Sequence, residues 1–163
     1  MELQSTYRVR FNDCDPLGHL NNARYIDYML NAREDHLGQF YQVSLPQFHR
    51  QGLAWVVKTH EIQYLRPAYY NEQITIVSRL IELTDAHLVV EMLMYDEKKQ
   101  SLKAVMWSNF TCIDPQTGKR KNHTPEFMEL ARIMDLHTVE LAAGLSERVK
   151  QLQVELKAGA SAA

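Results

Sequence analysis

The sequence predicts an α+β fold in which a curved antiparallel sheet wraps around one long central helix, with an extra C-terminal helix. Two observations lead to this prediction. Residues 20–37 carry a helical pattern whose apolar face is wide enough to be wrapped by a sheet. Four strand-like segments then follow closely between residues 55 and 113. A run of strands with short connections is typical of an antiparallel meander.

The first strand is expected over residues 5–11, where apolar and polar side chains alternate. Tyr7, Val9 and Phe11 fall on one side of this segment. Alternation of this kind is the pattern of a half-buried strand.

The helical segment 20–37 carries two apolar stripes at helical spacing. The stripes are formed by Ile26, Leu30 and Leu37 and by Tyr25, Met29 and Ala32. Gly38 is expected to end the helix. The following segment, 39–53, contains Pro46 and Gly52 and is expected to be irregular.

Four strands are expected after this irregular segment. They cover residues 55–65, 73–83, 87–95 and 102–113. The charged connector 96–100 suits a hairpin between the last two strands, and residues 114–118 are a turn signal.

Two helical segments complete the chain. Thr124 and Pro125 are the residue types favoured at a helix N-cap and at the first helical position. A second apolar stripe at helical spacing begins after Gly144. We expect residues 1–157 to form a single domain with a C-terminal helical extension, and residues 158–163 to form a flexible tail.

Composition excludes several classes of partner. A hydrophobic content of 45% and a charged content of 23% indicate a globular protein. The net charge of −2 argues against nucleic-acid binding or attachment to a membrane surface. No apolar run reaches membrane-spanning length, and no signal pattern opens the chain. Cys14 and Cys112 are expected to be free thiols in a reduced, cytoplasmic setting, with a single disulfide as the alternative.

The segment between the first strand and the long helix carries the candidate chemistry. It places a carboxylate, a proline-fixed turn and a glycine shortly before the helix, at Asp15, Pro16 and Gly18. Free N–H groups at a helix N-terminus carry partial positive charge and can hold an oxyanion. A general base or nucleophile beside such donors is half of a carbonyl-hydrolysing site.

This segment resembles the hotdog-fold acyl-CoA thioesterases, in particular the 4-hydroxybenzoyl-CoA thioesterase-like branch. The resemblance covers residues 5 to about 130 in the order strand, helix, four strands, and it rests on the motif Asp15-Pro16-x-Gly18-His19-x-Asn21-Asn22-x-x-Tyr25. It implies a hotdog fold and the hydrolysis of an acyl-CoA thioester to a free carboxylic acid and CoA. It also implies a homodimer or homotetramer with the site at the subunit interface, and neither a cofactor nor a metal.

The resemblance further implies roles for individual residues. Asp15 is expected to activate water or to attack the thioester carbonyl itself, and the backbone N–H of Asn22 to polarise the carbonyl oxygen. The residues expected to shape the loop and bind substrate are Gly18, His19, Asn21 and Tyr25. One oxyanion donor is typically worth about 3–4 kcal/mol of barrier, and a positioned base contributes roughly 10²–10⁴-fold in rate.

Two features depart from the family pattern. The namesake of the branch has apolar or aromatic residues in place of His19 and Asn21, so its aromatic substrate does not transfer to this chain. The family also often has Gly-Asp between the second and third strands, where this chain has Asn71 and Glu72. The acyl group, and the choice between CoA and acyl carrier protein, are left open.

Simpler structural roles exist for the same residues. Asp15 is also favoured as a cap or turn residue. Asn21 and Asn22 suit the unsatisfied donors at a helix start, and Tyr25 suits the core. Asp13 is expected to be a turn or solvent-facing carboxylate.

Other functional classes fit less well. Asp13 opens an EF-hand-like pattern, but Arg24 stands where calcium needs a bidentate glutamate. The sequence has no Gly-x-Ser-x-Gly motif and no glycine-rich phosphate loop. The basic segment 118–123 and Arg66 are candidates for contact with CoA phosphates. Two alternatives stay open: a hotdog dehydratase or hydratase with His19 as base, and a non-catalytic module that binds acyl-CoA or acyl carrier protein.

Overall fold

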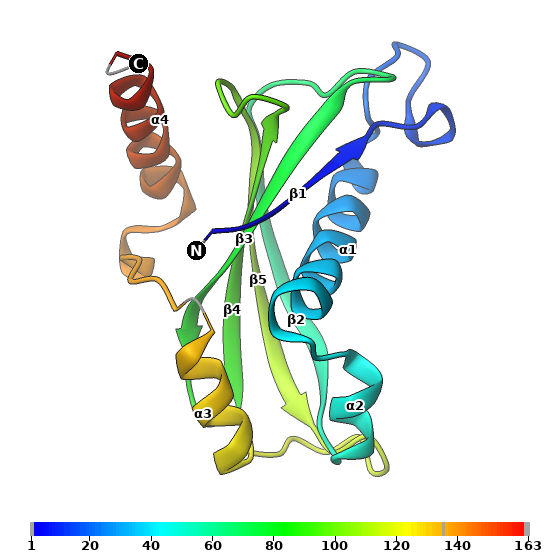
Figure 1. The fold of residues 1–163 in the computed structure, drawn as a ribbon, viewed down its shortest axis with the longest axis vertical. Helices are drawn as coiled ribbons and strands as arrows, with labels where there is room; N and C mark the ends of the chain where they lie inside the picture. The colour runs from blue at the N-terminus through cyan, green and yellow to red at the C-terminus, as the bar shows by residue number, and fades with distance from the viewer. Residues whose placement is uncertain (1, 135, 162–163) are drawn as a thin grey trace.

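Figure 1 shows the computed structural model, which describes residues 2–134 and 136–161. In this part of the chain, five strands form one antiparallel sheet in the spatial order β1–β3–β4–β5–β2. The strands are β1 (Leu3–Arg8), β2 (Ala54–Tyr64), β3 (Gln73–Leu83), β4 (His87–Asp96) and β5 (Leu102–Ile113). The antiparallel sheet is confirmed. The meander, however, includes only β3, β4 and β5, because β2 pairs with β5 at the far edge.

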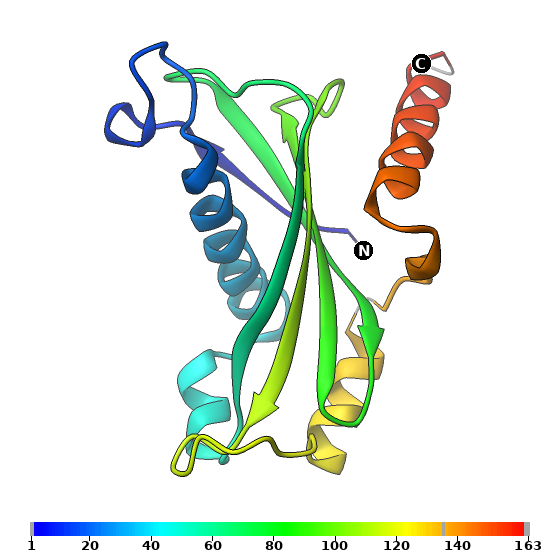
Figure 2. The same ribbon diagram turned by 180° about the vertical axis from the view of Figure 1, so that it is seen from behind.

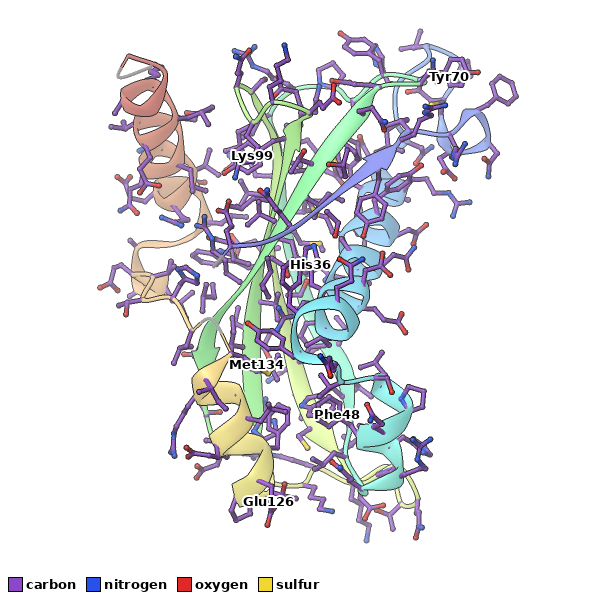
Figure 3. All side chains as sticks on the ribbon, in the orientation of Figure 1. His36, Phe48, Tyr70, Lys99, Glu126 and Met134 are labelled. Atoms are coloured by element: carbon purple, nitrogen blue, oxygen red, sulfur yellow. The ribbon has the colours of Figure 1, made fainter. Side chains whose placement is uncertain are left out.

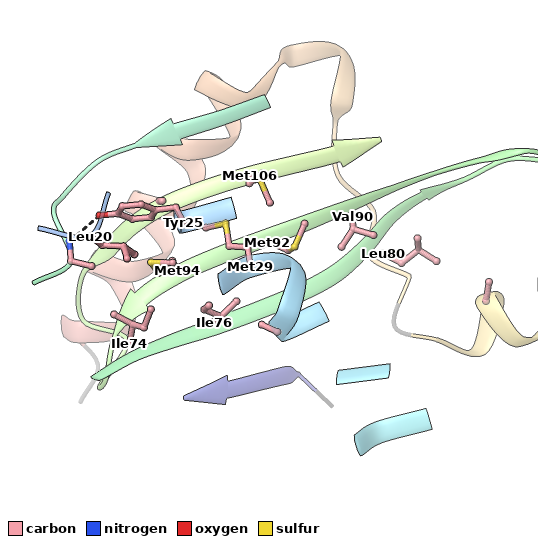
Figure 4. Close-up of a cluster of buried hydrophobic side chains, with 14 of the residues drawn as sticks. Leu20, Tyr25, Met29, Ile74, Ile76, Leu80, Val90, Met92, Met94 and Met106 are labelled. Carbon is pink, nitrogen blue, oxygen red and sulfur yellow. Dashed lines mark hydrogen bonds between the residues drawn. The ribbon is translucent and has the colours of Figure 1, made fainter. Parts of the chain in front are cut away.

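The long helix α1 (Asn22–Tyr41) packs on one face of the sheet, called the inner face here. Met29 of α1 is fully buried and lies among three methionines of the sheet (Figure 4). These methionines are Met92, Met94 and Met106. Unbranched thioether side chains fill irregular gaps between a helix and a twisted sheet. In β3 and β4, alternate apolar side chains belong to the core on this inner face, among them Ile74, Ile76, Val90 and Met92.

The predicted bounds of α1 were wrong at both ends. The helix begins at Asn22, because Asn21 has an extended backbone and caps the helix through its side chain. Gly38 does not end the helix but lies within it. The left-handed residue that ends it is Gln42, with a φ of 55°, and its N–H donates to the carbonyl oxygen of Leu37.

The prediction that segment 39–53 is irregular was wrong in part, because the segment contains the short helix α2 (Leu45–Arg50). The backbone N–H of Ser44 donates to the side-chain oxygen of Gln47 at 2.7 Å. Pro46 stands in the first turn of α2, where a missing N–H costs nothing. Pro46 therefore marks the start of a helix. The overlooked signal was the pair of Ser44 and Gln47, which are three residues apart and form a capping box.

The first strand also differs from the prediction, because β1 ends at Arg8. Phe11 opens a short 3₁₀ turn, η1 (Phe11–Asp13), and its side chain is 79% exposed. Val9 is buried as predicted, but its main chain bonds to Glu72 and Asn71. The alternation of Tyr7, Val9 and Phe11 thus continues past the end of β1 and into the turn η1, so the predicted end of the strand was too late.

The C-terminal part of the chain forms α3 (Pro125–Ile133), the 3₁₀ turn η2 (Leu141–Ala143) and α4 (Leu145–Ser161). Thr124 caps α3 as predicted, accepting from the N–H of Phe127. The two views in Figures 1 and 2 place α4 on the sheet face opposite to α1. Its buried residues Leu145, Val149 and Leu152 pack there against a second apolar cluster.

The helix α4 continues through residues 158–161, where a flexible tail was predicted, and residues 162–163 lie outside the described part. Within the described residues, no helix is long and apolar enough to cross a membrane.

Candidate active site

The loop between η1 and α1 is held by the backbone and by the carboxylate of Asp15. Oδ1 of Asp15 accepts hydrogen bonds from the N–H groups of Leu17 at 2.9 Å and His19 at 3.0 Å. The N–H of Asp15 donates to the carbonyl oxygen of His19 at 2.7 Å. The loop thus closes on itself around one carboxylate oxygen. The other, Oδ2, has no hydrogen bond to a described residue.

Gly18 supplies the backbone turn that this closure needs. Its φ is +75°, a left-handed value that favours glycine. Its N–H donates to the carbonyl oxygen of Asp15 at 3.0 Å, and its own carbonyl accepts from the N–H of Tyr70 at 2.9 Å. Gly18 therefore allows the loop to turn and ties it to the segment that follows β2.

The helix start presents a free donor beside this loop. Oδ1 of Asn21 accepts from the N–H of Ala23 at 3.0 Å, which makes Asn21 the N-cap of α1. The N–H of Asn22 belongs to the first turn, which has no intrahelical acceptor. Among the described residues it makes no hydrogen bond outside the helix. Tyr64 of β2 anchors this turn, because its hydroxyl donates to the carbonyl oxygen of Asn22 at 2.7 Å.

A cavity of about 250 Å³, called the loop cavity here, lies between this helix start and the end of β2. Four of the predicted site residues line it: Asp15, His19, Asn22 and Tyr25. Gly18 and Asn21 are not among the lining residues, and their bonds give both a role in building the loop. The structure thus brings the carboxylate and the free helix donor together in one cavity.

Of the opposite wall of the loop cavity, only Arg66 was predicted from the sequence, as a candidate for contact with CoA phosphates. This wall comes from the connection between β2 and β3 and consists of Tyr64, Leu65, Arg66 and Pro67. The available signal was the Arg66–Pro67 pair, which marks the end of a strand. That the strand ends beside the loop follows from the pairing of β2 with β5, which no local pattern indicates.

Tyr25 joins the cavity to the core. Its side chain is buried, and its hydroxyl accepts from the N–H of Ala68 at 2.9 Å (Figure 4). Its ring meets that of Tyr64 edge-on at 5.1 Å. Burial raises the pKa of both phenols, so both remain neutral. Tyr25 is thus a packing residue whose ring forms part of the cavity wall.

His19 faces a polar cluster at the outer side of the loop. Its ring meets Tyr69 edge-on at 5.0 Å. Glu72 accepts from the N–H of Tyr69 at 2.8 Å and pairs with Lys103 at 2.8 Å.

Asn71 adopts a φ of 66°, which explains why glycine suits this position in the family. Asparagine tolerates the same conformation.

The remaining candidates of the sequence do not join the site. Asp13 is a turn residue of η1, as predicted, and its carboxylate faces the protein rather than solvent, since it accepts from the hydroxyl of Tyr28 at 2.8 Å. Burial and the nearby charges of Asp13 and Asp15 raise the pKa of Cys14, which disfavours a reactive thiolate. Cys14 and Cys112 are both free, as predicted. No group of three or more potential metal-binding side chains occurs among the described residues.

The basic segment 118–123 lies at the other end of the molecule. It follows β5 beside α2, whereas the loop that precedes α1 lies at the opposite end of the sheet (Figure 1). Lys121 of this segment donates to the carbonyl oxygen of Gly52 at 3.0 Å. Of the two candidates for CoA phosphates, only Arg66 reaches the loop cavity.

The sequence profile of the thioesterase-like superfamily matches residues 9–142, which include the loop, the helix start and the whole sheet after β1. The chain belongs to this superfamily. It is 31% identical over 117 residues to the long-chain acyl-CoA thioesterase FadM of Escherichia coli strain K12. That match covers 72% of this chain and 87% of FadM.

Solved structures of thioesterases share the fold. YbaW, a probable thioesterase from Escherichia coli, is 30% identical with a TM-score of 0.71, over 81% of this chain and 98% of YbaW. A DHNA-CoA thioesterase from Staphylococcus aureus has a TM-score of 0.73 at 18% identity, over 81% of this chain and 90% of its own. The hotdog fold is therefore confirmed, and the chain is a thioester hydrolase. The hydratase and binding-module alternatives receive no support from these relatives.

Proposed function

We propose that this thioesterase hydrolyses an acyl-CoA to a free carboxylic acid and CoA at the loop cavity, with Asp15 as general base or nucleophile. The observation that carries the proposal is that Asp15 and the first turn of α1 line the same cavity. The name of the relative FadM supports acyl-CoA as the substrate class.

The two oxygens of Asp15 have separate tasks in this proposal. Oδ1 holds the loop through the N–H groups of Leu17 and His19. Oδ2 is left for chemistry, either to take a proton from water or to attack the thioester carbon. In the second route an anhydride forms as the CoA thiolate leaves, and water then releases the acid. Both routes need the carboxylate ionised.

The N–H of Asn22 is the proposed oxyanion donor. Charge develops on the carbonyl oxygen as the tetrahedral intermediate forms, and a donor of this kind contributes about 3–4 kcal/mol. The helix start adds partial positive charge at the same point. The bond from Tyr64 to the Asn22 carbonyl holds that turn in place without using its N–H.

Arg66 and the edge strand β2 are the parts of the protein that we expect to contact the CoA phosphates and a second subunit. Arg66 is exposed and lines the cavity, so its guanidinium suits the phosphates of CoA. Tyr64 lies on β2, an edge strand of the sheet whose Val56 and Val57 are also exposed. We infer a homodimer that covers this edge and places a second subunit beside the cavity.

The test compares Asp15→Asn with Asp13→Asn, and release of CoA is followed with a thiol reagent. Asparagine retains an oxygen that can accept from Leu17 and His19, so the loop is preserved while the base is lost. Asp13 lies two residues away, bonds to Tyr28 and does not line the cavity. We expect Asp15→Asn to lose at least about a hundredfold in turnover and Asp13→Asn to remain near wild type. Equal losses in both would overturn the assignment of Asp15.

A further inference from the structure

Lys103 of β5 is a buried cation that the proposed reaction does not use. Its side chain is only 6% exposed, and the other residues of the run 102–107 are apolar. Burying an ammonium group is costly unless the group is paired and hydrogen-bonded. A lysine therefore remains at such a position only where specific contacts stabilise it.

A β-bulge takes Lys103 out of the alternation of its strand. In the pairing of β5 with β4, Ala104 lies opposite Met94, whereas Leu102 lies opposite the next residue, Tyr95. Lys103 is thus the extra residue of the bulge. A bulge re-aims the side chain that it carries, and bulges are frequent next to active sites.

The main chain and the side chain of Lys103 both bond to the wall of the loop cavity formed by residues 64–67, called the cavity wall here. The carbonyl oxygen of Lys103 accepts from the N–H groups of Leu65 at 2.8 Å and Arg66 at 3.1 Å. Its ammonium donates to the carbonyl oxygen of Pro67 at 2.9 Å. One lysine therefore holds three of the four residues of the cavity wall.

The Lys103 ammonium also holds residues 67–72, called the wall segment here. It pairs with Oε1 of Glu72 at 2.8 Å, and Oε2 of Glu72 accepts from the N–H of Tyr69 at 2.8 Å. The N–H of Glu72 in turn donates to the carbonyl oxygen of Tyr69 at 3.0 Å. The wall segment is thus bonded to the same nitrogen at both of its ends, Pro67 and Glu72.

The main chain of the wall segment braces the loop that carries Asp15. The N–H of Tyr70 donates to the carbonyl oxygen of Gly18 at 2.9 Å. The N–H of Leu20 donates to the carbonyl oxygen of Ala68 at 2.8 Å. A displacement of the wall segment would therefore be transmitted to the loop.

His19 provides a third contact between the loop and the wall segment. Its ring meets Tyr69 edge-on at 5.0 Å, and the Lys103 ammonium lies 5.9 Å from the centroid of the same tyrosine ring. A cation within about 6 Å of an aromatic ring is attracted to its face. Tyr69 therefore contacts both the buried ammonium and a ring that lines the loop cavity.

We propose that Lys103 is a positioning residue of this thioesterase, which acts through the wall segment to hold the loop of Asp15 and the ring of His19 in the geometry that hydrolysis needs. This inference rests on the proposed function, since hydrolysis is the reaction that is positioned. The pair of Lys103 with Glu72 can be removed while the main-chain bonds to the cavity wall remain.

The test replaces Lys103 with methionine, alone and together with Glu72→Gln. The single variant leaves the Glu72 carboxylate without its cation and should have a lower Tm than wild type. The double variant removes that charge and should recover part of the Tm. Lys99→Met is the matched control. Lys99 also pairs with a glutamate, Glu2, and lies toward the same end of the molecule as Tyr70 (Figure 3), but its partners do not line the loop cavity.

We would measure kcat and KM for CoA release at a temperature at which every variant is folded. Both Lys103 variants should lose at least about tenfold in kcat, because a misplacement of about 1 Å can cost about a hundredfold. KM should stay near that of wild type, since the main chain of Lys103 still holds Arg66, and Lys99→Met should change neither constant. An unchanged kcat, a loss confined to KM, or a double variant that recovers kcat together with Tm would overturn the proposal.

NMR of the His19 ring separates this inference from the proposed function. The ring resonance, assigned by its loss in His19→Gln, reports on the neighbouring Tyr69 ring without any turnover. If no acyl-CoA is hydrolysed but the double variant shifts this resonance and Lys99→Met does not, the hydrolase assignment fails and the support of the loop by Lys103 stands. If hydrolysis depends on Asp15 but both Lys103 variants keep full kcat, the positioning role alone is refuted.

Discussion

Asp15 and His19 are joined by two hydrogen bonds, one between their main chains and one from the His19 main chain to the Asp15 side chain. The N–H of Asp15 donates to the His19 carbonyl at 2.7 Å, and the N–H of His19 donates to Oδ1 of Asp15 at 3.0 Å. The carboxylate that we assign to catalysis is therefore also the group that orders its own loop.

This double role predicts different effects for two substitutions of Asp15. Asp15→Ala removes the acceptor for Leu17 and His19 and should lower the free energy of unfolding by about 1–3 kcal/mol. Asp15→Asn keeps an acceptor and should lie within about 0.5 kcal/mol of wild type. Urea unfolding followed by circular dichroism measures both. Equal stability of the alanine and asparagine variants would contradict the loop role.

Tyr64→Phe tests the anchor of the helix start. Loss of the hydroxyl removes the 2.7 Å bond to the Asn22 carbonyl and frees the turn that carries the proposed oxyanion donor. We expect kcat to fall by about three- to tenfold, the effect of one ordinary hydrogen bond. Tyr70→Phe is the control, because Tyr70 is exposed and does not line the loop cavity. An unchanged kcat in Tyr64→Phe would show that this bond does not position the donor.

His36 predicts a pH-dependent stability. It is fully buried with Nδ1 bonded to Ser78 at 2.7 Å, and burial, together with the charge of Arg33, lowers its pKa to about 4. Between pH 6.5 and 4 the unfolded chain binds a proton at His36 that the folded chain does not. Stability should therefore fall with decreasing pH by up to about 3 kcal/mol from this group.

The control for this prediction is His36→Gln, which retains hydrogen-bonding groups but does not titrate. The difference in unfolding free energy between wild type and this variant should be constant above pH 6.5 and change below it. A difference that stays constant down to pH 4 would show that His36 is protonated in the folded state.

Glu91 and Arg148 connect the outer face of the sheet to α4. Glu91 is 0% exposed and accepts two hydrogen bonds from Arg148 at 2.9 Å, with Arg79 at 3.5 Å. Arg148→Met leaves that carboxylate with the indole N–H of Trp107 at 3.1 Å and the more distant Arg79. It removes the two closest charged donors of a buried carboxylate and should cost about 3 kcal/mol or more of stability. The double variant with Glu91→Gln should cost less than the sum of the single ones. Strict additivity in urea unfolding would rule out the coupling.

Local patterns were sufficient for most of the fold. The strands β3 and β5 and the start of α3 follow their predicted bounds, because each combines a strong periodicity with a clear turn or cap signal. The predictions based on Gly38 and Pro46 were wrong, because each residue was interpreted alone. Gly38 does not end α1, and Pro46 lies in the first turn of α2. The deciding partners were Gln42 and Gln47, whose roles are visible only in backbone angles and bonds.

The site divides in the same way. Asp15 and Asn22 were predictable because one continuous motif holds the loop and the helix start. Arg66 was named as a candidate for CoA phosphates, but its position beside the loop was not predictable. The same holds for Tyr64, since both reach the cavity only through the pairing of β2 with β5 at the far edge of the sheet. The apolar cavity between α1, α2, α3 and the sheet also depends on contact between distant segments, which leaves no periodic signal in the sequence.

The most direct test of the central claim is the rate of CoA release from a 16-carbon acyl-CoA by wild type and Asp15→Asn, prepared in parallel and shown to have equal stability. We predict a fall of at least about a hundredfold, because the variant preserves the loop and lacks only the carboxylate charge. Equal rates would contradict the account and remove Asp15 from the chemistry.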